Sequence, residues 1–534
     1  MTKPKRKHLA TLIVVLFCTV LLSYSVAFAN NIQVTNASLT GQNTAEGYWL
    51  VQFDLDWENS WRTSSAPNNW DAAWVFVKYR ITTANGGDDI WKHASLNNSG
   101  HSGGTGTAST IDAGLRTPGS AFDAATNPAV GVFIYRSADG TGTFSITGAQ
   151  LRWNYGNILA DNPSIEVKVF AIEMVYVPEG AFAVGSGGTE NGSFTNGSWT
   201  SGATIPLSIS SESALTIGQS SGNLWETFSI IGAGTLPAAF PKGFAGFYSM
   251  KYGITQQQYV DFLNTLTYNQ QNARVNGPPN AAAGTFTNNA NRHKIKIHTS
   301  GVASTTPAIY ETEHPFVANN FLSWMDGAAY SDWSGLRPMT ELEFEKVSRG
   351  TIAPVANEYA WGTATIANTA YTLSNSGLSN EGIATNYSTT AGNARFNQDL
   401  GSIDGPLRVG IFAGHDSNTG RITAGASRYG IMELSGNLWE RPVTVGNADG
   451  RAFTGVHGDG TLSTNGHANE TAWPGLISGA VTGAVGSGFR GGSWSSSAIF
   501  LRVSDRGGAA TTTTLRNGSY GFRGVRSLPV AVGG

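Results

Sequence analysis

Cysteine is almost absent from the sequence: the 534-residue chain contains one, Cys18. This residue lies in an N-terminal segment that we expect to be removed, so the mature chain has no thiol. The absence excludes disulfide bonds, thiolate nucleophiles, cysteine-ligated zinc and iron–sulfur clusters. Charge is also scarce, with 13% charged residues and a formal net charge of −3. Without a basic excess the chain has no electrostatic footprint for nucleic acid, and we expect no such partner.

Long apolar runs are rare as well. The longest extends from Leu9 to about Val26, follows a basic cluster and precedes Ala27-Phe28-Ala29, which fits the small-x-small cleavage rule. We predict a secretory signal peptide over residues 1–29, with an uncleaved membrane anchor as the alternative. The mature protein is then exported from a bacterium, to the periplasm, the medium or the cell surface, and no other run is long enough to span a membrane.

Glycine is abundant by contrast, with 67 residues, and clusters of Gly, Asn, Ser and Thr separate short apolar runs. The clearest runs in the first part of the mature chain cover residues 49–57, 73–80, 130–135 and 165–170. Short strands at regular intervals, separated by turn residues, favour an all-β, sandwich-like domain over residues 30–172.

Helical patterns begin only after residue 172. Thr255 is a candidate N-cap for a helix that reaches Thr267, and a second helix is expected from about Phe321 to Trp333. A third begins at a capping box in the text Thr-Glu-Leu-Glu at 340–343. Few helices within Gly- and Asn-rich text predict an α+β domain over residues 173–528.

Ordered motifs along this second region resemble the formylglycine-generating enzyme, or sulfatase-modifying factor, family. They include the text from Leu336 to Lys346, Gly-Asn-Leu-Trp-Glu at 436–440, Arg-Gly-Gly-Ser-Trp at 490–494 and Gly-Phe-Arg at 521–523. The resemblance implies a variant of the C-type lectin fold for residues 173–528. It implies nothing about the preceding domain.

The positions that carry catalysis in the family are replaced here. The resemblance implies two copper-binding cysteines after the Arg-Gly-Gly-Ser-aromatic motif, and Ser496 and Leu501 stand at those positions. Copper(I) requires soft thiolate ligands, so we expect no copper. Another branch uses iron held by histidines, for which His293 and His298 are the nearest pair. The alternative for these two histidines is a solvated loop.

Calcium needs only oxygen ligands, and the resemblance implies structural calcium sites around the Gly-Asn-x-Trp-Glu motif. Carried over by position, the candidate ligands are Glu433, Leu434, Gly436, Leu438 and Glu440 for one site, and Asn393, Ala394 and Asp404 for a second. The alternative is that these residues only cap and pack loops. The text Ser-Gly-Asn-Leu-Trp-Glu at 221–226 repeats the motif earlier in the chain.

The stretch 495–520 contains no Lys, Glu, Gln, Trp or Met. These five types cannot arise when the adenines of an Asn codon are randomised and its third base is kept. In this the chain resembles the variable proteins of diversity-generating retroelements, in which a fold of this family displays a C-terminal patch diversified by adenine-specific reverse transcription. The resemblance implies a variable region over 490–526, with an ordinary Ser/Thr/Gly loop as the alternative. The candidate surface positions are Ser495, Ser496, Ser497, Ile499, Phe500, Ser504, Asp505, Gly507, Gly508, Thr511, Thr513, Leu515, Asn517, Gly518, Ser519 and Tyr520.

These features predict an exported, non-catalytic binding protein whose C-terminal surface recognises a protein or glycan ligand at a cell or phage surface. The interleaved residues Arg490, Leu501, Arg502, Arg506, Arg516 and Arg523 would hold the fold, as a rigid scaffold holds a variable paratope. One alternative is an oxidoreductase of the sulfatase-modifying-factor type with a metal site that needs no cysteine. Another is a purely structural component of the cell envelope.

Overall fold

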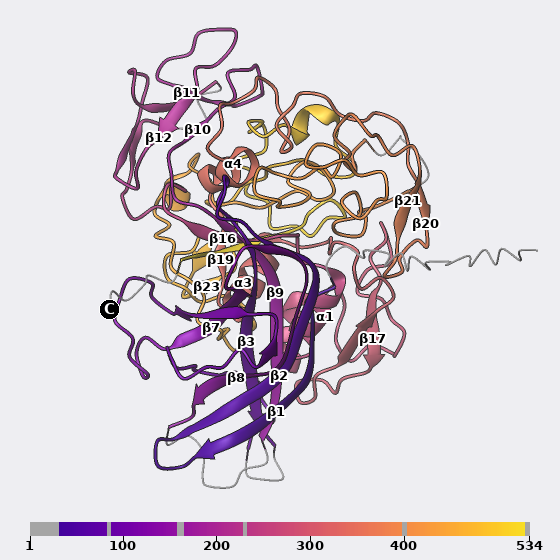
Figure 1. Ribbon diagram of the computed structural model, residues 1–534. Coiled ribbons are helices and arrows are strands. Elements are labelled where there is room, and N and C mark those ends of the chain that lie inside the picture. The colour runs from indigo at the N-terminus through magenta and orange to yellow at the C-terminus, as the bar shows by residue number, and fades with distance from the viewer. Residues whose placement is uncertain (1–30, 83–86, 157–164, 228–231, 398–402, 529–534) are drawn as a thin grey trace, which may run out of the picture.

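The computed structural model describes residues 31–82, 87–156, 165–227, 232–397 and 403–528, so the predicted signal peptide lies outside the described residues. A strand-rich part that contains β1, β2, β3 and β8 lies below a coil-rich part in Figure 1. None of the helices in the described ranges is both long enough and apolar enough to cross a membrane. The α+β class predicted from the sequence is confirmed.

The strand-rich part is a sandwich of two antiparallel sheets. The outer sheet has the order β1-β2-β8-β5 and consists of β1 (Gln33–Asn43), β2 (Tyr48–Arg62), β8 (Gly140–Asn154) and β5 (Thr105–Gly106). Alternate residues of β2 and β8 point inward, among them Phe53, Trp57 and Leu151, and all three are fully buried. A side-chain period of two places such residues on one face, so the alternation in the sequence determines which face packs against the second sheet.

The second sheet continues from the sandwich into the coil-rich part. Its order is β19-β24-β16-β9-β3-β7-β6, with β4 beside β3. The strands are β19 (Arg337–Pro338), β24 (Gly524–Ser527), β16 (Phe247–Met250), β9 (Ile165–Val177), β3 (Asp71–Ile81), β7 (Ala129–Arg136), β6 (Ser109–Leu115) and β4 (Lys92–His93).

Strand β9 contains the predicted domain boundary at 172/173. It pairs with β3 on one side, from Asp71 opposite Val175 to Ile81 opposite Ile165, and with β16 on the other. Strand β3 is buried on both faces, since Val75 packs in the sandwich core whereas Trp74 packs with Trp333 and other residues of the coil-rich part. The two sequence regions therefore share one sheet and two adjoining cores.

The helices of the coil-rich part are short, and each α-helix begins at a residue whose side chain caps it. They are α1 (Gln256–Leu263), α2 (Tyr268–Arg274), α3 (Trp324–Trp333), α4 (Glu341–Arg349), α5 (Ala448–Arg451) and the 3-10 turn η2 (Ala498–Leu501). Capping boxes at Thr255 and Thr340 confirm the predicted starts. The first predicted helix is shorter than expected, because α1 ends at Leu263 and Thr267, its predicted end, is the N-cap of α2.

The remaining strands form small sheets. Their members are β10 (Phe182–Val184) with β12 (Leu207–Ile209); β11 (Phe194–Asn196), β14 (Leu224–Glu226), β13 (Leu215–Ile217) and β15 (Gly234–Leu236); β17 (Ile295–Thr299) with β18 (Ile309–Thr312); β20 (Thr372–Ser374) with β21 (Gly382–Thr385); and β22 (Leu476–Ile477) with β23 (Ala480–Val481). Long coils connect them and carry the C-terminal surface.

Candidate recognition surface

Four arginines fix the C-terminal coil to the interior of the domain. Each pairs with a buried carboxylate: Arg490 with Glu341 and Glu345, Arg506 with Glu226 and Glu341, Arg516 with Asp326, and Arg523 with Glu440. The nitrogen–oxygen distances include 2.9 Å for Arg490–Glu345, 2.7 Å for Arg516–Asp326 and 2.8 Å for Arg523–Glu440. Charge-assisted pairs at such distances hold the coil at four separate points.

Helix α4 supplies two of these five carboxylates, Glu341 and Glu345. Its nine residues are all buried, which is unusual for a segment with sequence Glu-Leu-Glu-Phe-Glu-Lys-Val-Ser-Arg. Glu343 caps the helix and pairs with Arg337 at 2.6 Å, while Arg349 contacts both Glu345 and Glu358. Buried charges require partners, and the charged side chains of α4 accordingly form the centre of an ion-pair network.

Between the anchoring residues, most predicted surface positions are accessible. Seven of the sixteen are exposed and six are half-buried. The exposed positions are Ser495, Ser497, Ile499, Gly507, Thr511, Leu515 and Asn517, and the half-buried ones are Ser496, Phe500, Gly508, Thr513, Ser519 and Tyr520. Leu515 is 69% exposed and Ile499 50%, whereas Leu501 is fully buried. The coil thus alternates between accessible side chains and anchors.

Three of the sixteen positions are buried, and the structure corrects their assignment to the surface. Ser504 is fully buried, where its hydroxyl contacts Arg349 at 2.9 Å and Glu345 at 3.1 Å. Asp505 is buried, and desolvation raises its pKa to about 6. A Cβ added to Gly518 would lie 2.3 Å from Asn291 Oδ1, so no larger residue fits without movement.

An aromatic cluster lies in the middle of this surface. The rings of Phe489 and Tyr520 are 4.5 Å apart, and the ring of Trp439 is 5.9 Å from Phe489 and 6.0 Å from Phe500. The buried guanidinium of Arg441 lies 4.4 Å from the centre of the Phe489 ring. Trp439, Phe500 and Tyr520 are each half-buried, so part of each ring faces solvent. Rigid aromatic side chains of this type are common anchors in protein interfaces.

Backbone contacts join the motif at 436–440 to the end of the variable stretch. Trp439 donates to the carbonyl of Ser519 at 2.9 Å, and Gly521 donates back to the carbonyl of Trp439 at 3.0 Å. Ser495 Oγ lies 2.8 Å from Ser519 Oγ. The two ends of the predicted variable region therefore lie side by side, although 24 positions separate these serines.

The donor set at the family's copper positions does not fit copper. Ser496 Oγ is 3.0 Å from Ser493 Oγ, and the Leu501 side chain is fully buried among apolar residues. His293 is buried with both ring nitrogens in contacts to Thr287 and Asn320, whereas His298 is exposed beside Glu311. The two histidines therefore have different partners and form no common ligand pair.

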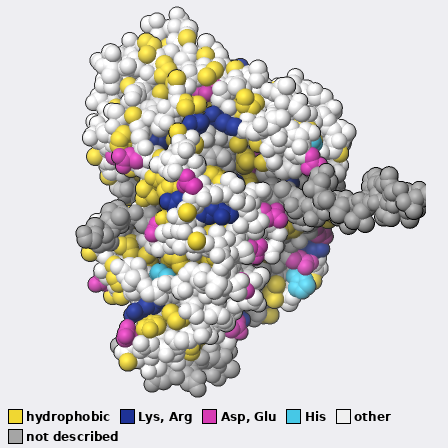
Figure 2. Space-filling model, viewed as in Figure 1, with side chains coloured by type: hydrophobic (Ala, Val, Ile, Leu, Met, Phe, Trp, Pro, Cys, Tyr) yellow, Lys and Arg dark blue, Asp and Glu magenta, His cyan; other side chains and the backbone are white. Residues whose placement is uncertain are grey.

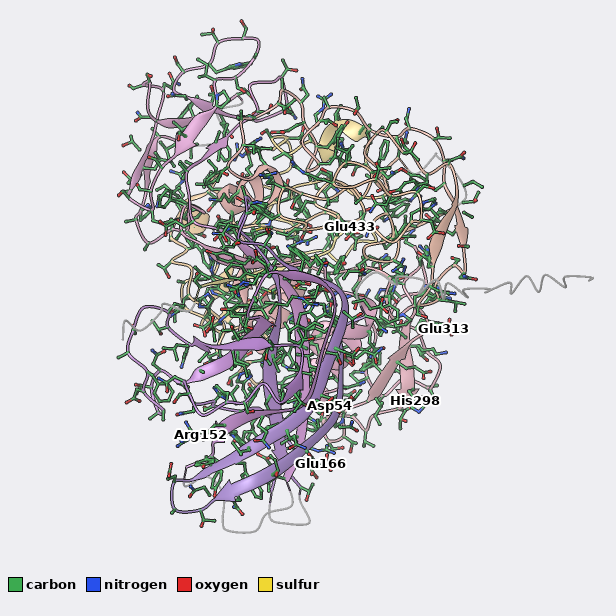
Figure 3. The ribbon with its side chains drawn as sticks, in the orientation of Figure 1. Asp54, Arg152, Glu166, His298, Glu313 and Glu433 are labelled. Carbon is green, nitrogen blue, oxygen red and sulfur yellow. The ribbon has the colours of Figure 1, made fainter. Side chains whose placement is uncertain are left out.

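The first predicted calcium site has two carboxylate oxygens without partners. Glu433 and Glu440 line a cavity of about 10 Å³ together with Asn437 and Arg523, and Figure 3 labels Glu433 in the coil-rich part. Oε2 of each glutamate is buried and has no hydrogen-bond donor. Burial raises the pKa of Glu433 to about 7 and also raises that of Glu440. Unpaired oxygens beside a cavity of ionic size fit a cation, so Glu433 and Glu440 could hold one. The predicted backbone ligands Leu434, Gly436 and Leu438 are all buried beside them.

The second predicted calcium site does not fit. The Asn393 side-chain oxygen accepts from Tyr371 at 3.0 Å and from the Ser388 amide at 2.9 Å, which uses both of its lone pairs. Asp404 is exposed and accepts from Asn291, and Ala394 packs in an apolar cluster. Hydroxyl and amide donors of the protein therefore satisfy the side-chain oxygens of Asn393 and Asp404.

The repeated text at 221–226 has a structural role that the sequence did not reveal. Its last residue, Glu226 in β14, pairs with Arg506, as Glu440 at the end of the second copy pairs with Arg523. Each copy thus supplies a buried carboxylate to an arginine of the C-terminal coil. The similarity of the two sequence segments could have indicated this shared role, but their spacing could not identify the two arginine partners.

Two larger cavities border β9, of about 380 and 330 Å³, and residues 490–526 line neither of them. Figure 2 shows only scattered charged side chains on the face in view.

The domain is an α+β scaffold whose anchored coils carry small polar side chains around a partly exposed aromatic cluster. The model of the sulfatase-modifying factor enzyme 1-like domain (FGE-sulfatase) matches residues 171–528, and the chain belongs to this family. No curated protein matches the chain.

Proposed function

We propose that the protein is an exported, non-catalytic recognition protein whose C-terminal coil binds a protein or glycan ligand. The observation that carries this proposal is the separation of roles along 490–526. Arg490, Leu501, Arg506 and Arg523 are buried, while thirteen of the sixteen candidate positions are at least partly accessible. A surface that can change its side chains without changing its anchors suits diversification by a retroelement.

The site chemistry also favours recognition over the oxidoreductase alternative. Ser496 and Leu501 offer no soft ligand where the family's copper enzymes need two. Tyr, Ser, Asn and Thr side chains around Trp439 provide adaptable hydrogen bonds and rigid apolar contacts, which is the composition of antibody paratopes. Calcium at Glu433 and Glu440 would stabilise the loops beneath this surface and take no part in chemistry.

Sequencing the gene across many isolates tests the proposal. Substitutions should concentrate at the exposed positions, such as Ser497, Ile499 and Leu515, and spare Arg490, Arg506 and their carboxylate partners. A near-copy of the codons for 490–526, with Asn codons at the variable positions, should lie beside a reverse transcriptase gene. Substitutions spread evenly over the coil, with no such copy, would refute diversification.

Binding is tested separately on glycan arrays and on bacterial cells. A Leu515→Ala, Ile499→Ala variant should lose binding, whereas Ile309→Ala should retain it. Ile309 is a matched control because it is 51% exposed on β18, outside the C-terminal coil. Equal binding by the two variants would place the recognition surface elsewhere.

A further inference from the structure

The two cavities that border β9 and a third, smaller one adjoin and form a groove. Their volumes are about 380, 330 and 120 Å³. The first and second share the lining residues Lys168 and Asn264, and the first and third share Ile32, Ala171, Gln258 and Asp261. The groove follows β9 from Glu166 to Glu173, and α1 lies beside this strand (Figure 1). Among the described residues, no position of 490–526 lines it, so the groove is separate from the C-terminal coil.

Along this groove, β9 has a partner strand on one side only. Strand β3 pairs with it from Ile165 to Val175, whereas β16 pairs with it only from Met174 to Val177. In the part of the chain that the structure describes, the second edge of residues 165–172 therefore has no partner strand. An unpaired edge of this length is a template for one more strand.

The backbone groups of Val167, Val169 and Ala171 point toward this open edge. The carbonyl of Glu173 accepts from the amide of Lys251, on the β16 side, at 3.0 Å. Backbone groups alternate in direction along a strand, so every second residue before Glu173 points the same way. Three amides and three carbonyls at regular spacing therefore face the groove, and each needs a hydrogen-bond partner from outside the sheet.

The two walls of the groove differ in character. The wall on the sandwich side is apolar, because Val167, Val169 and Ala171 pack there with Ile32 and Val34. The opposite wall carries polar side chains, which are Lys168 from β9 and Gln258, Asp261 and Asn264 from the groove side of α1. An extended chain in the groove would meet apolar groups on one face and polar groups on the other.

Lys168 and Asp261 are charged groups that form no salt bridge with any other described residue. Lys168 Nζ lies 3.5 Å from the Asn264 carbonyl and 4.7 Å from the centre of the Trp91 ring, and Asp261 accepts from Gln257 at 2.8 Å. Partial burial lowers the pKa of Lys168 and raises that of Asp261. A ligand group of opposite charge would offset the desolvation of each side chain.

We propose that the groove binds an extended peptide segment of a partner protein as an added strand on β9. Backbone hydrogen bonds to Val167, Val169 and Ala171 would hold the segment, and its alternate side chains would contact the two walls. The segment would place apolar residues against the sandwich wall. On its other face it would carry a basic residue for Asp261 and an acidic residue for Lys168.

The row of strand amides and carbonyls favours a peptide over a glycan. Its repeat is that of a β-strand, which another peptide backbone matches group by group and a sugar chain does not. Alternate side chains of a strand share a face, so the basic and acidic residues of the segment should stand an even number of positions apart.

Two blocked peptides test the proposal, acetyl-Thr-Val-Lys-Val-Glu-Val-Thr-amide and the same peptide with Lys and Glu exchanged, because the added strand can run in either direction. Each carries a fluorophore and is titrated with the mature chain by anisotropy. Asp261→Asn should weaken binding of the tighter peptide about tenfold. Asp416→Asn, at an exposed position outside the groove, should leave it unchanged. Equal affinity of the two variants, or no binding of either peptide at millimolar concentration, would refute the site.

Methylation of the peptide backbone supplies the second measurement. In an added strand, the amides of the three valines point one way and those of Lys and Glu the other. Methylation of one set should abolish binding, and methylation of the other set should not. Equal binding of the two methylated peptides would exclude pairing with β9. Binding of chitohexaose that Asp261→Asn weakens, with no binding of either peptide, would identify a glycan groove and overturn the proposal.

Discussion

Arg506→Met tests whether buried ion pairs hold the recognition surface in place. Arg506 is 1% exposed; its Nε lies 2.5 Å from Glu341, it also pairs with Glu226, and its guanidinium is 3.9 Å from the centre of the Phe194 ring. Methionine retains the apolar contact with Phe194 but leaves the two carboxylates without this cation. Removal of one partner from a buried pair costs about 3–5 kcal/mol, and we expect a loss of unfolding free energy in that range.

The pH dependence of this loss has a definite sign. Burial by itself would raise the pKa of Glu341, but Arg506 and Arg490 lower it below its usual 4.5. A carboxyl group with a depressed folded-state pKa stabilises the fold above its unfolded pKa, and this contribution is lost as the pH falls through the folded value. In Arg506→Met the contribution is smaller, so the deficit should be largest near pH 7 and narrow toward pH 4. Urea unfolding followed by tryptophan fluorescence measures it.

Arg502→Met is the matched control, since Arg502 is half-buried on the same coil and donates to Asn357 Oδ1 at 3.1 Å. It should lose less than about 1 kcal/mol. A loss of similar size in both variants, or a deficit in Arg506→Met that does not change with pH, would refute the idea that compensation of buried carboxylates anchors the coil.

Three further predictions follow from burial and topology. Because burial raises the pKa of Glu433 to about 7, this group should lower stability in calcium-free buffer as the pH rises from 4.5 to 7, and Glu433→Gln should reduce the decline while the exposed Glu313→Gln does not. The difference, up to about 3 kcal/mol, is read from melting curves at several pH values, and parallel curves for all three proteins would contradict it. Ser504→Lys should destabilise the fold by about 3 kcal/mol or more, because it places a charge at a buried position. Ser497→Lys, at an exposed position, should change stability by less than about 0.5 kcal/mol. Equal effects of the two substitutions in chemical denaturation would be inconsistent with the assigned burial. Deletion of residues 31–156 should yield insoluble protein, because β9 loses its pairing with β3 and the core beneath Trp333 is opened; a soluble fragment with cooperative melting would show that the coil-rich part is independent.

The sequence by itself determined the local elements and the family. Partial period-two alternation predicted β2, since a strand with one buried face alternates, and a short apolar run predicted β3, which is buried on both faces. Thr255 and Thr340 signalled helix starts through side-chain caps that need only neighbouring residues. The restricted alphabet of 495–520 marked the accessible coil. Sequence also suggested that the interleaved arginines hold the fold; Arg490, Arg506 and Arg523 are buried, whereas Arg502 and Arg516 are half-buried.

Tertiary structure decided which of these positions are truly at the surface. Ser504 and Gly518 have the composition of surface residues, but contacts with Arg349 and Asn291, distant in sequence, remove them from it. The Asn393 side-chain oxygen also has protein donors that the sequence did not reveal, the hydroxyl of Tyr371 and the backbone amide of Ser388. The sequence also did not predict that the two regions share a sheet through β9, because strand pairing between distant segments depends on how the whole chain packs and not on the pattern within one strand.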